Sequence, residues 1–219
     1  MIYRTTRLEA PPFLSSSWND PPWDRLRPGV IHHHMGETPA HLPEAEFKLA
    51  YDRDALYVKF LVADRYVLAR AKADQAEVWK DSCVEFFFTP GTDISLGYFN
   101  LEMNCSGTLL FHFQKRPREN RIIISHEDCR AVERVHSMPK TVDPEISEHM
   151  TWTVGYRLPV SLLEKYCPVV SPRPGVVWRA NFYKCADASS HPHWLTWAKV
   201  DMPRPDFHQP AFFGRLAFK

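Results

Sequence analysis

The chain has 219 residues, of which 44% are hydrophobic and 24% are charged, a composition typical of a globular protein rather than a disordered one. Its 27 Lys and Arg residues balance 26 Asp and Glu residues, which leaves a formal net charge of +1. This balance excludes the strongly basic surface that attracts nucleic acid or an anionic membrane, so we expect neither as a partner. The length favours one domain over two.

The sequence lacks the usual targeting and cofactor motifs. No stretch of about 18 uncharged apolar residues occurs, and the first ten residues contain arginines without the apolar core of a signal peptide. The five cysteines are odd in number and show no CxxC spacing, which favours reduced thiols over a disulfide framework or a zinc site. We therefore expect a cytoplasmic location; an extracellular protein whose signal had been removed would show the same sequence features.

Residues 1–45 are predicted to form an irregular arm that packs on the domain. They are rich in Pro and Trp and show neither helical nor strand periodicity. Phe13, Trp18 and Trp23 indicate docking rather than a free tail, because a docked Trp buries a large apolar area. The arm is expected to cover a sheet face or edge.

Alternating apolar and polar residues begin at Glu46 and predict a series of short strands. The stretch Glu46–Asp64 is typical of a β-hairpin, with its turn at residues 52–54. Further strands are predicted at residues 83–89, 98–104, 109–113, 121–125 and 131–136. The polar stretch 139–149 is predicted to be a loop.

The C-terminal third continues this pattern. Strands are predicted at residues 152–158, 176–183 and 214–218, with one short helix opened by Pro159. Many short strands and a single helix indicate an all-β protein, an antiparallel β-sandwich spanning residues 46–219. Trp152 and Trp178 fall on the inward positions of their strands and are assigned to the core.

The outward positions of three strands are candidates for a binding face, because one side of each strand is taken up by the core. They carry carboxylates, amides and a guanidinium: Asp81, Cys83 and Glu85; Asn100, Glu102 and Asn104; Arg179, Asn181 and Tyr183. This mixture of donors and acceptors suits sugar hydroxyls, each of which both donates and accepts. Flat indole rings can stack on the apolar faces of a sugar. The alternative is a solvated sheet face, with its Trp residues packed in the core.

Several motifs occur in an order that resembles a known family. Residues 78–88 read VWKDSCVEFFF and residues 98–104 read YFNLEMN. Further matching stretches follow at residues 152–159, 178–183, 197, 207–210 and 213–216. Together they resemble family 9 carbohydrate-binding modules, in the stand-alone form rather than the form attached to xylanases, from about Phe47 to the C-terminus.

The resemblance implies a non-catalytic β-sandwich that holds the end of a mono- or oligosaccharide between two tryptophans. Trp79 is then one wall and Trp197 the other, with Trp194 close enough to compete for the second position. The polar groups carried over by position are Glu85, Asn104, Asn181 and, as a weaker match, Arg179. The strand around Glu102 lacks the arginine that the xylanase-linked modules carry near it.

Two other functions stay open at this point. A glycan-processing enzyme would use Glu85, together with Glu102 on the neighbouring strand, as its carboxylate pair. A redox subunit on a related sandwich would bind haem through Met103 with His112 or Lys184. The oligomeric state is left open by the sequence.

A cofactor is not required by this interpretation. Calcium is a candidate ion, because Asp52, Asp54 and Asp64 supply oxygen ligands around the predicted hairpin. Aspartates that form turns are the simpler explanation.

Overall fold

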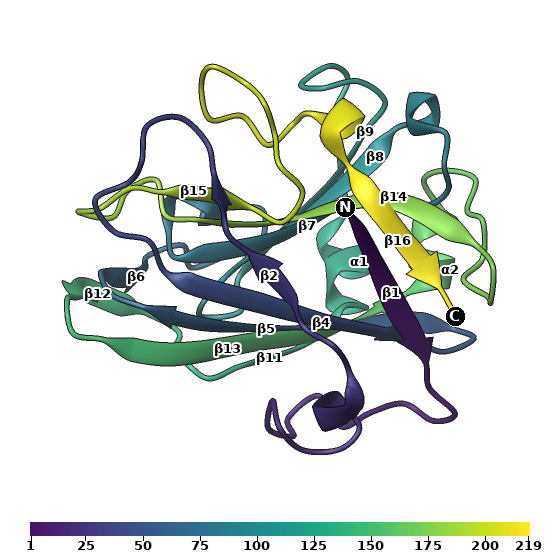
Figure 1. Cartoon of the computed structure of the whole chain (residues 1–219), viewed down its shortest axis with the longest axis horizontal. Coiled ribbons are helices and arrows are strands. Elements are labelled where there is room, and N and C mark those ends of the chain that lie inside the picture. The colour runs from purple at the N-terminus through teal and green to yellow at the C-terminus, as the bar shows by residue number, and fades with distance from the viewer.

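The computed structural model describes all residues 1–219 and shows two layers of β-strands packed face to face (Figure 1). The first layer contains, in spatial order, β10 (Ile122–Ile123), β9 (Leu109–Gln114), β8 (Tyr98–Asn104), β7 (Cys83–Thr89), β14 (Val177–Cys185) and β16 (Gly214–Phe218). The second layer contains β4 (Glu44–Tyr51), β5 (Ala55–Asp64), β13 (Met150–Pro159) and β11 (Glu133–His136). Most neighbours are antiparallel, so the predicted all-β sandwich is confirmed.

The strand β1 (Ile2–Arg7) connects the two layers. Its residues 2–5 pair in parallel with β16, and residues 6–7 pair in parallel with β4. Figure 1 shows this purple strand beside the yellow C-terminal strand, with the N-terminus near the middle of the view and the C-terminus to its lower right. A parallel strand between distant segments is not marked by a hairpin turn, and β1 was therefore missed in the sequence.

The rest of the predicted arm also contributes strands. The segment β2 (Gly29–Ile31) pairs with β4, while β3 (His33–His34) pairs with β15 (Trp194–Thr196), which in turn pairs with β14. The three aromatic residues of the arm behave differently from one another. Trp23, in the 3-10 helix η1 (Trp23–Arg25), is fully buried; Trp18 is half-buried; Phe13 is 83% exposed. The expectation that all three dock is therefore wrong for Phe13.

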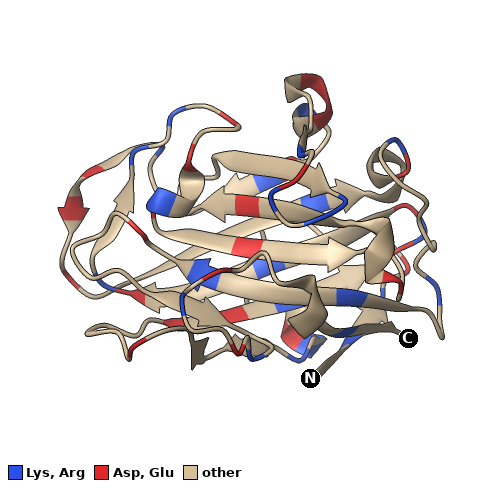
Figure 2. Ribbon diagram, turned by 90° about the horizontal axis from the view of Figure 1, so that it is seen from above, with Lys and Arg blue, Asp and Glu red and all other residues tan.

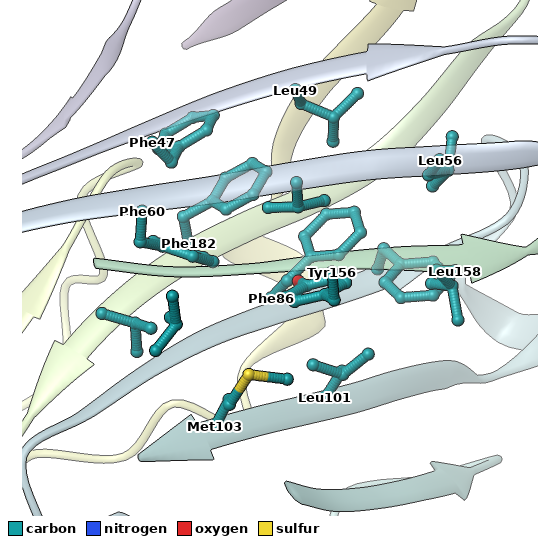
Figure 3. Packing of buried hydrophobic residues seen from close by; sticks show 14 of the residues in the cluster. Phe47, Leu49, Leu56, Phe60, Phe86, Leu101, Met103, Tyr156, Leu158 and Phe182 are labelled. Carbon is teal, nitrogen blue, oxygen red and sulfur yellow. The ribbon is translucent and has the colours of Figure 1, made fainter. Parts of the chain in front are cut away.

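The inward side chains of the two layers form one apolar core (Figure 3). Phe47 of the second layer stacks on Phe182 of the first, with ring centroids 3.5 Å apart, and Phe182 also stacks on Phe86. Trp152 and Trp178 are fully buried in this core, as their inward positions predict. Because side chains alternate along the strands, one whole face of the first layer packs in the core and stabilises the fold.

The short elements show where sequence patterns were informative. The predicted helix is α2 (Val160–Leu163), which begins after Pro159. A second helix, α1 (His126–Arg130), was missed although Ser125 caps it by accepting from the amide of Asp128. The predicted loop at 139–149 contains β12 (Val142–Ile146), which pairs with β6 (Val67–Ala69) outside both layers. Only its two end residues, Val142 and Ile146, have large apolar side chains, and Pro144 between them argues against a strand.

Three further 3-10 helices complete the chain: η2 (Val78–Lys80), η3 (Ile94–Leu96) and η4 (Pro210–Phe212). The helices are all too short to span a membrane. Basic and acidic segments are interspersed around the ribbon in Figure 2, in keeping with the near-zero net charge.

Candidate functional site

The outward face of the first layer carries polar side chains brought together by strand register. Glu85 of β7 lies directly opposite Glu102 of β8, and Asn100 of β8 lies opposite His112 of β9. Since directly paired residues point to the same side of a sheet, these four groups share one face. They form part of the floor of a cavity of about 670 Å³, within the range of small-molecule sites.

Two tryptophans, Trp79 of η2 and Trp194 of β15, line the same cavity, and both are only partly buried. Asp187 connects them: its amide donates to the Trp79 carbonyl (3.2 Å), and its carboxylate accepts from Trp194 Nε1 (2.8 Å). Cys185 pairs directly with Trp194 across the strands. Asp187 therefore holds both the backbone of Trp79 and the indole ring of Trp194 in place.

A chain of hydrogen bonds holds the amides of the floor in place. Asn100 Nδ2 donates to Glu102 Oε1 (2.9 Å), and Gln114 Nε2 donates to Asn100 Oδ1 (2.9 Å). Gln114 Nε2 also lies 3.3 Å from His208 Nδ1, which is 2.8 Å from the hydroxyl of Tyr98. Such a network orients its members before any ligand arrives.

Other polar atoms of the floor have few or no hydrogen-bond partners within the protein. Glu102 Oε2 is buried without a hydrogen bond, although Glu102 is only 4% exposed. The ring of His112 is hydrogen-bonded to no other group of the protein. Glu85 Oε1 accepts only from the thiol of Cys185 (3.2 Å). Buried polar groups are normally paired, so these atoms are the natural points of contact for a bound molecule.

Burial shifts the titration of these groups toward their neutral forms. Burial raises the pKa of Glu102 to about 7 and that of Asp187 to about 6. The pKa of Glu85 is also raised well above its ordinary value, first by burial and then by neighbouring acidic groups. Burial lowers the pKa of His112 to about 4, so its imidazole is neutral near pH 7. The floor can therefore both donate and accept hydrogen bonds.

The sequence-predicted residues divide between the cavity and other places. Trp79 and Glu85 line the cavity. Trp197 does not: it is buried in the core, edge-on to Phe47 and Phe182. It packs over Gly214, where a Cβ would lie 2.6 Å from the indole. The second indole at the cavity is Trp194, the competing position.

Strand register explains this correction. Trp194 and Thr196 pair with Cys185 and Tyr183, whose side chains belong to the outward cluster. Leu195 and Trp197 fall on the opposite, inward side. Two tryptophans three residues apart must face opposite sides of an extended chain, and the sequence does not state which faces out.

Two asparagines expected at the site hold the backbone instead. Asn104 accepts from the amides of Ser106 and Thr108, in the turn after β8. Asn181 donates to the Ala198 carbonyl (2.9 Å) and accepts from the Ala198 amide (2.8 Å). Both side chains are fully buried and neither lines the cavity.

Arg179 likewise lies outside the cavity. Its guanidinium donates to the carbonyls of Phe213 and Gly214, just after η4. These contacts fix the C-terminal strand to β14 and leave the side chain no free face toward the cavity.

The expected haem ligands do not converge. Met103 is packed in the inward core, whereas His112 lies on the outward face of the same layer. Lys184 Nζ is 3.1 Å from Asp64 Oδ2 and fully buried. A sheet separates Met103 from His112, and the Lys184 ammonium is held by Asp64 and by His193 Nε2 (2.7 Å), so neither expected ligand pair is available to an iron.

The expected calcium ligands are separated too. Asp52 caps the hairpin turn by accepting from the amides of Asp54 and Ala55. Asp64 lies at the other end of β5, beside His41 and Lys184. A strand of this length spans about 30 Å, so these carboxylates cannot share an ion.

Other cavity residues were missed as site residues. Asn100 and Glu102 were recognised as outward-facing but were not assigned to the site, and His112 and Gln114 follow the same alternation on the next strand. Alternation on three adjacent strands could have found all four. Asp187, like the 205–208 segment opposite it, comes from a loop whose placement depends on the fold.

Comparisons with known proteins agree with this architecture. The model of the family described as Carbohydrate-binding family 9 matches residues 28–218. No curated protein matches the sequence. Among solved structures, a Bacteroides uniformis protein with a proposed role in carbohydrate binding is 29% identical, has a TM-score of 0.88, and covers 100% of this chain and 99% of its own.

Two more distant structures share the fold. Both are family 9 carbohydrate-binding modules from Caldicellulosiruptor kristjanssonii. One, in complex with cellotriose, is 15% identical with a TM-score of 0.66, covering 100% of this chain and 94% of its own. The other, in complex with glucose, is 17% identical with a TM-score of 0.64, covering 99% and 95%.

Proposed function

Because the chain belongs to carbohydrate-binding family 9, a family of non-catalytic modules, we propose that its cavity binds the end of a saccharide between Trp79 and Trp194. One observation carries this proposal: two partly exposed indoles, linked through Asp187, border a polar floor in which the buried Glu102 Oε2 has no hydrogen-bond partner. Indole faces suit the apolar C–H faces of a pyranose, and the floor suits its hydroxyls.

The proposed polar contacts are Glu85, Glu102 and His112. Glu102 Oε2 has no partner in the protein, and a sugar hydroxyl would supply one. The neutral imidazole of His112 offers one donor and one acceptor. Asn100 and Gln114 support these groups from the network behind them. Glu85 and Glu102 therefore serve as hydrogen-bonding groups and not as a hydrolytic pair.

The ligand class we propose is a glucose-containing mono- or oligosaccharide. The two modules of similar fold were solved in complex with cellotriose and with glucose, which makes these sugars the first probes. We expect modest affinity, because an open site exchanges water hydrogen bonds for sugar hydrogen bonds at small net gain.

Calorimetric titration with glucose, cellotriose and xylan oligosaccharides tests the proposal. We expect wild-type protein to bind at least one of them, and Trp79→Ala and Trp194→Ala each to weaken binding about tenfold or more, a cost of about 1.4 kcal/mol. Trp18→Ala is the matched control, because this tryptophan is half-buried against Lys48, away from the cavity. Unchanged binding in Trp194→Ala, with its fold retained by circular dichroism, would refute the stacking role.

We further propose a reducing compartment such as the cytoplasm, where short oligosaccharides would be the ligands. All five cysteines are free, including Cys83 and Cys185, which lie directly opposite each other on paired strands. Alkylation and mass spectrometry of protein from its native cells would test this, since an oxidised Cys83–Cys185 pair contradicts it.

A further inference from the structure

Two cysteines and a glutamate meet on the outward face of the first layer, and two of the three, Glu85 and Cys185, line the cavity. Cys83 of β7 lies directly opposite Cys185 of β14, and Glu85 follows two positions along β7 on the same face. One ligand atom from each of Cys83, Glu85 and Cys185 lies within 4.8 Å of the other two. All three side chains are at least 98% buried.

We propose that Cys83, Glu85 and Cys185 form a binding site for a thiophilic divalent metal ion, Zn²⁺ in particular, whose fourth coordination position faces the cavity. The three ligands come from two adjacent strands of a rigid sheet, so little reorganisation is needed to bring them onto one ion. Glu85 and Cys185 line the cavity and so give the ion a path of entry, whereas Cys83 lies behind them.

No cationic side chain of the protein pairs with the two glutamates at this site. Glu85 and Glu102 lie opposite each other, and neither forms an ion pair with Lys or Arg. Independently, Glu102 Oε2 is buried, lacks any hydrogen-bond partner and belongs to the same cavity. Binding exchanges the two thiol protons for one divalent ion, so it adds no net charge to this buried site.

The donor types select the metal. Two thiolates and one carboxylate suit Zn²⁺, which binds sulfur at about 2.3 Å in tetrahedral geometry, whereas Ca²⁺ and Mg²⁺ prefer oxygen ligands alone. The thiolate is the ligand, so binding transfers the two thiol protons to solvent without any change of oxidation state. Three protein ligands leave one position for water or for a hydroxyl of a molecule in the cavity.

Cobalt substitution gives a direct test, and it is independent of saccharide binding. The full chain, reduced and freed of metal with a chelator, is titrated with Co²⁺. We expect the absorption bands of thiolate-bound tetrahedral cobalt to saturate at one equivalent, and to bleach when Zn²⁺ is added. Cys83→Ser and Cys185→Ser should each abolish the thiolate-to-cobalt band.

The matched control is Cys105→Ser, because Cys105 is an equally buried thiol that packs in the inward core and donates to Leu68. This variant should bind cobalt like the wild type. Absence of the band in reduced wild-type protein, or its persistence in Cys83→Ser, would overturn the proposal. Isolation of the protein with a Cys83–Cys185 disulfide, followed by no metal uptake after reduction, would overturn it as well.

Discussion

The two faces of the first layer differ in almost every chemical respect, although the same strands build both. Phe86 and Phe87 are neighbours on β7: Phe86 stacks between Phe88 and Phe182 in the inward core, while Phe87 lines the outward cavity. On the inward face the neighbours are apolar; on the outward face they include Glu85, Glu102 and other polar groups. Adjacent residues of one strand therefore have different roles: one packs in the core and stabilises the fold, and the next lines the cavity.

The outward face is nevertheless buried, and this distinguishes it from an ordinary solvated sheet. A second apolar cluster covers part of it, joining Phe87 and Tyr183 to Val200 and Phe207 of the C-terminal segment. Tyr183 stacks on Phe207 with ring centroids 4.2 Å apart. The polar floor is thus framed by apolar walls, a setting in which hydrogen bonds to a ligand are strengthened.

The inward face should show the largest effect on stability. Phe86→Ala is expected to lower the free energy of unfolding by about 3–5 kcal/mol, because it leaves a cavity among stacked rings. Urea denaturation measures this change. Saccharide affinity should stay within about threefold of the wild type, whereas the neighbouring variant Phe87→Ala should weaken it more. Equal effects of both variants on affinity would abolish the distinction between the faces.

Lowering the pH should destabilise the protein through His208 on the outward face. Burial lowers the pKa of this histidine to about 4. The unfolded chain then binds more protons than the folded one between about pH 4 and 6.5, so stability falls as the pH is lowered through this window. The loss from this group reaches about 3 kcal/mol. Denaturation at pH 7 and pH 4.5 should show a smaller loss in His208→Gln than in the wild type.

His112 and His193, which have similarly lowered pKa values, remain in that variant, so the difference isolates His208. An identical pH dependence of His208→Gln and wild type would show that the ring is not neutral and buried in solution.

Asn181, which hydrogen-bonds to the backbone of Ala198, should have an intermediate effect on the stability of the protein. Asn181→Ala removes both hydrogen bonds to the Ala198 backbone and leaves those groups unpaired, at a cost of about 1–3 kcal/mol. Thermal unfolding measures it, with the exposed Asn19→Ala as the control. A stability equal to that of the control would contradict the assignment of Asn181 to structure.

The smallest effect is expected at Asp187, which positions one indole without belonging to the floor. Asp187→Ala frees Trp194 Nε1 and should weaken saccharide binding about fivefold, with little change in stability. Comparison of the titrations of Asp187→Ala and Trp194→Ala sharpens the account. If Asp187→Ala were the more damaging of the two, Asp187 would contact the ligand directly.

The bounds of several strands are the part of the fold that the sequence predicted well. The bounds predicted for β7, β8 and β16 are those of the structure, and in β8 the apolar Phe99, Leu101 and Met103 alternate with polar residues. The parallel strand β1 has no such alternation and its partners lie far away in the chain. The pairing of β1 with β16 and β4 is determined by how the two layers assemble, and local sequence patterns do not encode that.

The site was predicted less completely, for a related reason. The alternation of side chains along a strand correctly predicted that Asn104, Arg179 and Asn181 lie on the outward side of their strands. It could not show that all three side chains would hydrogen-bond to the backbone: Asn104 in the turn after β8, Arg179 to the segment after η4, and Asn181 to Ala198. Whether an outward residue meets a ligand or a covering segment depends on long-range contacts, and the same holds for the choice between Trp194 and Trp197.

The most direct test of the account is a crystal structure of the protein soaked with cellotriose. The account predicts one terminal glucose ring between the indoles of Trp79 and Trp194, with its hydroxyls on Glu85, Glu102 or His112. An empty cavity at saturating sugar, or a sugar bound on another surface while these indoles stay unoccupied, would contradict it.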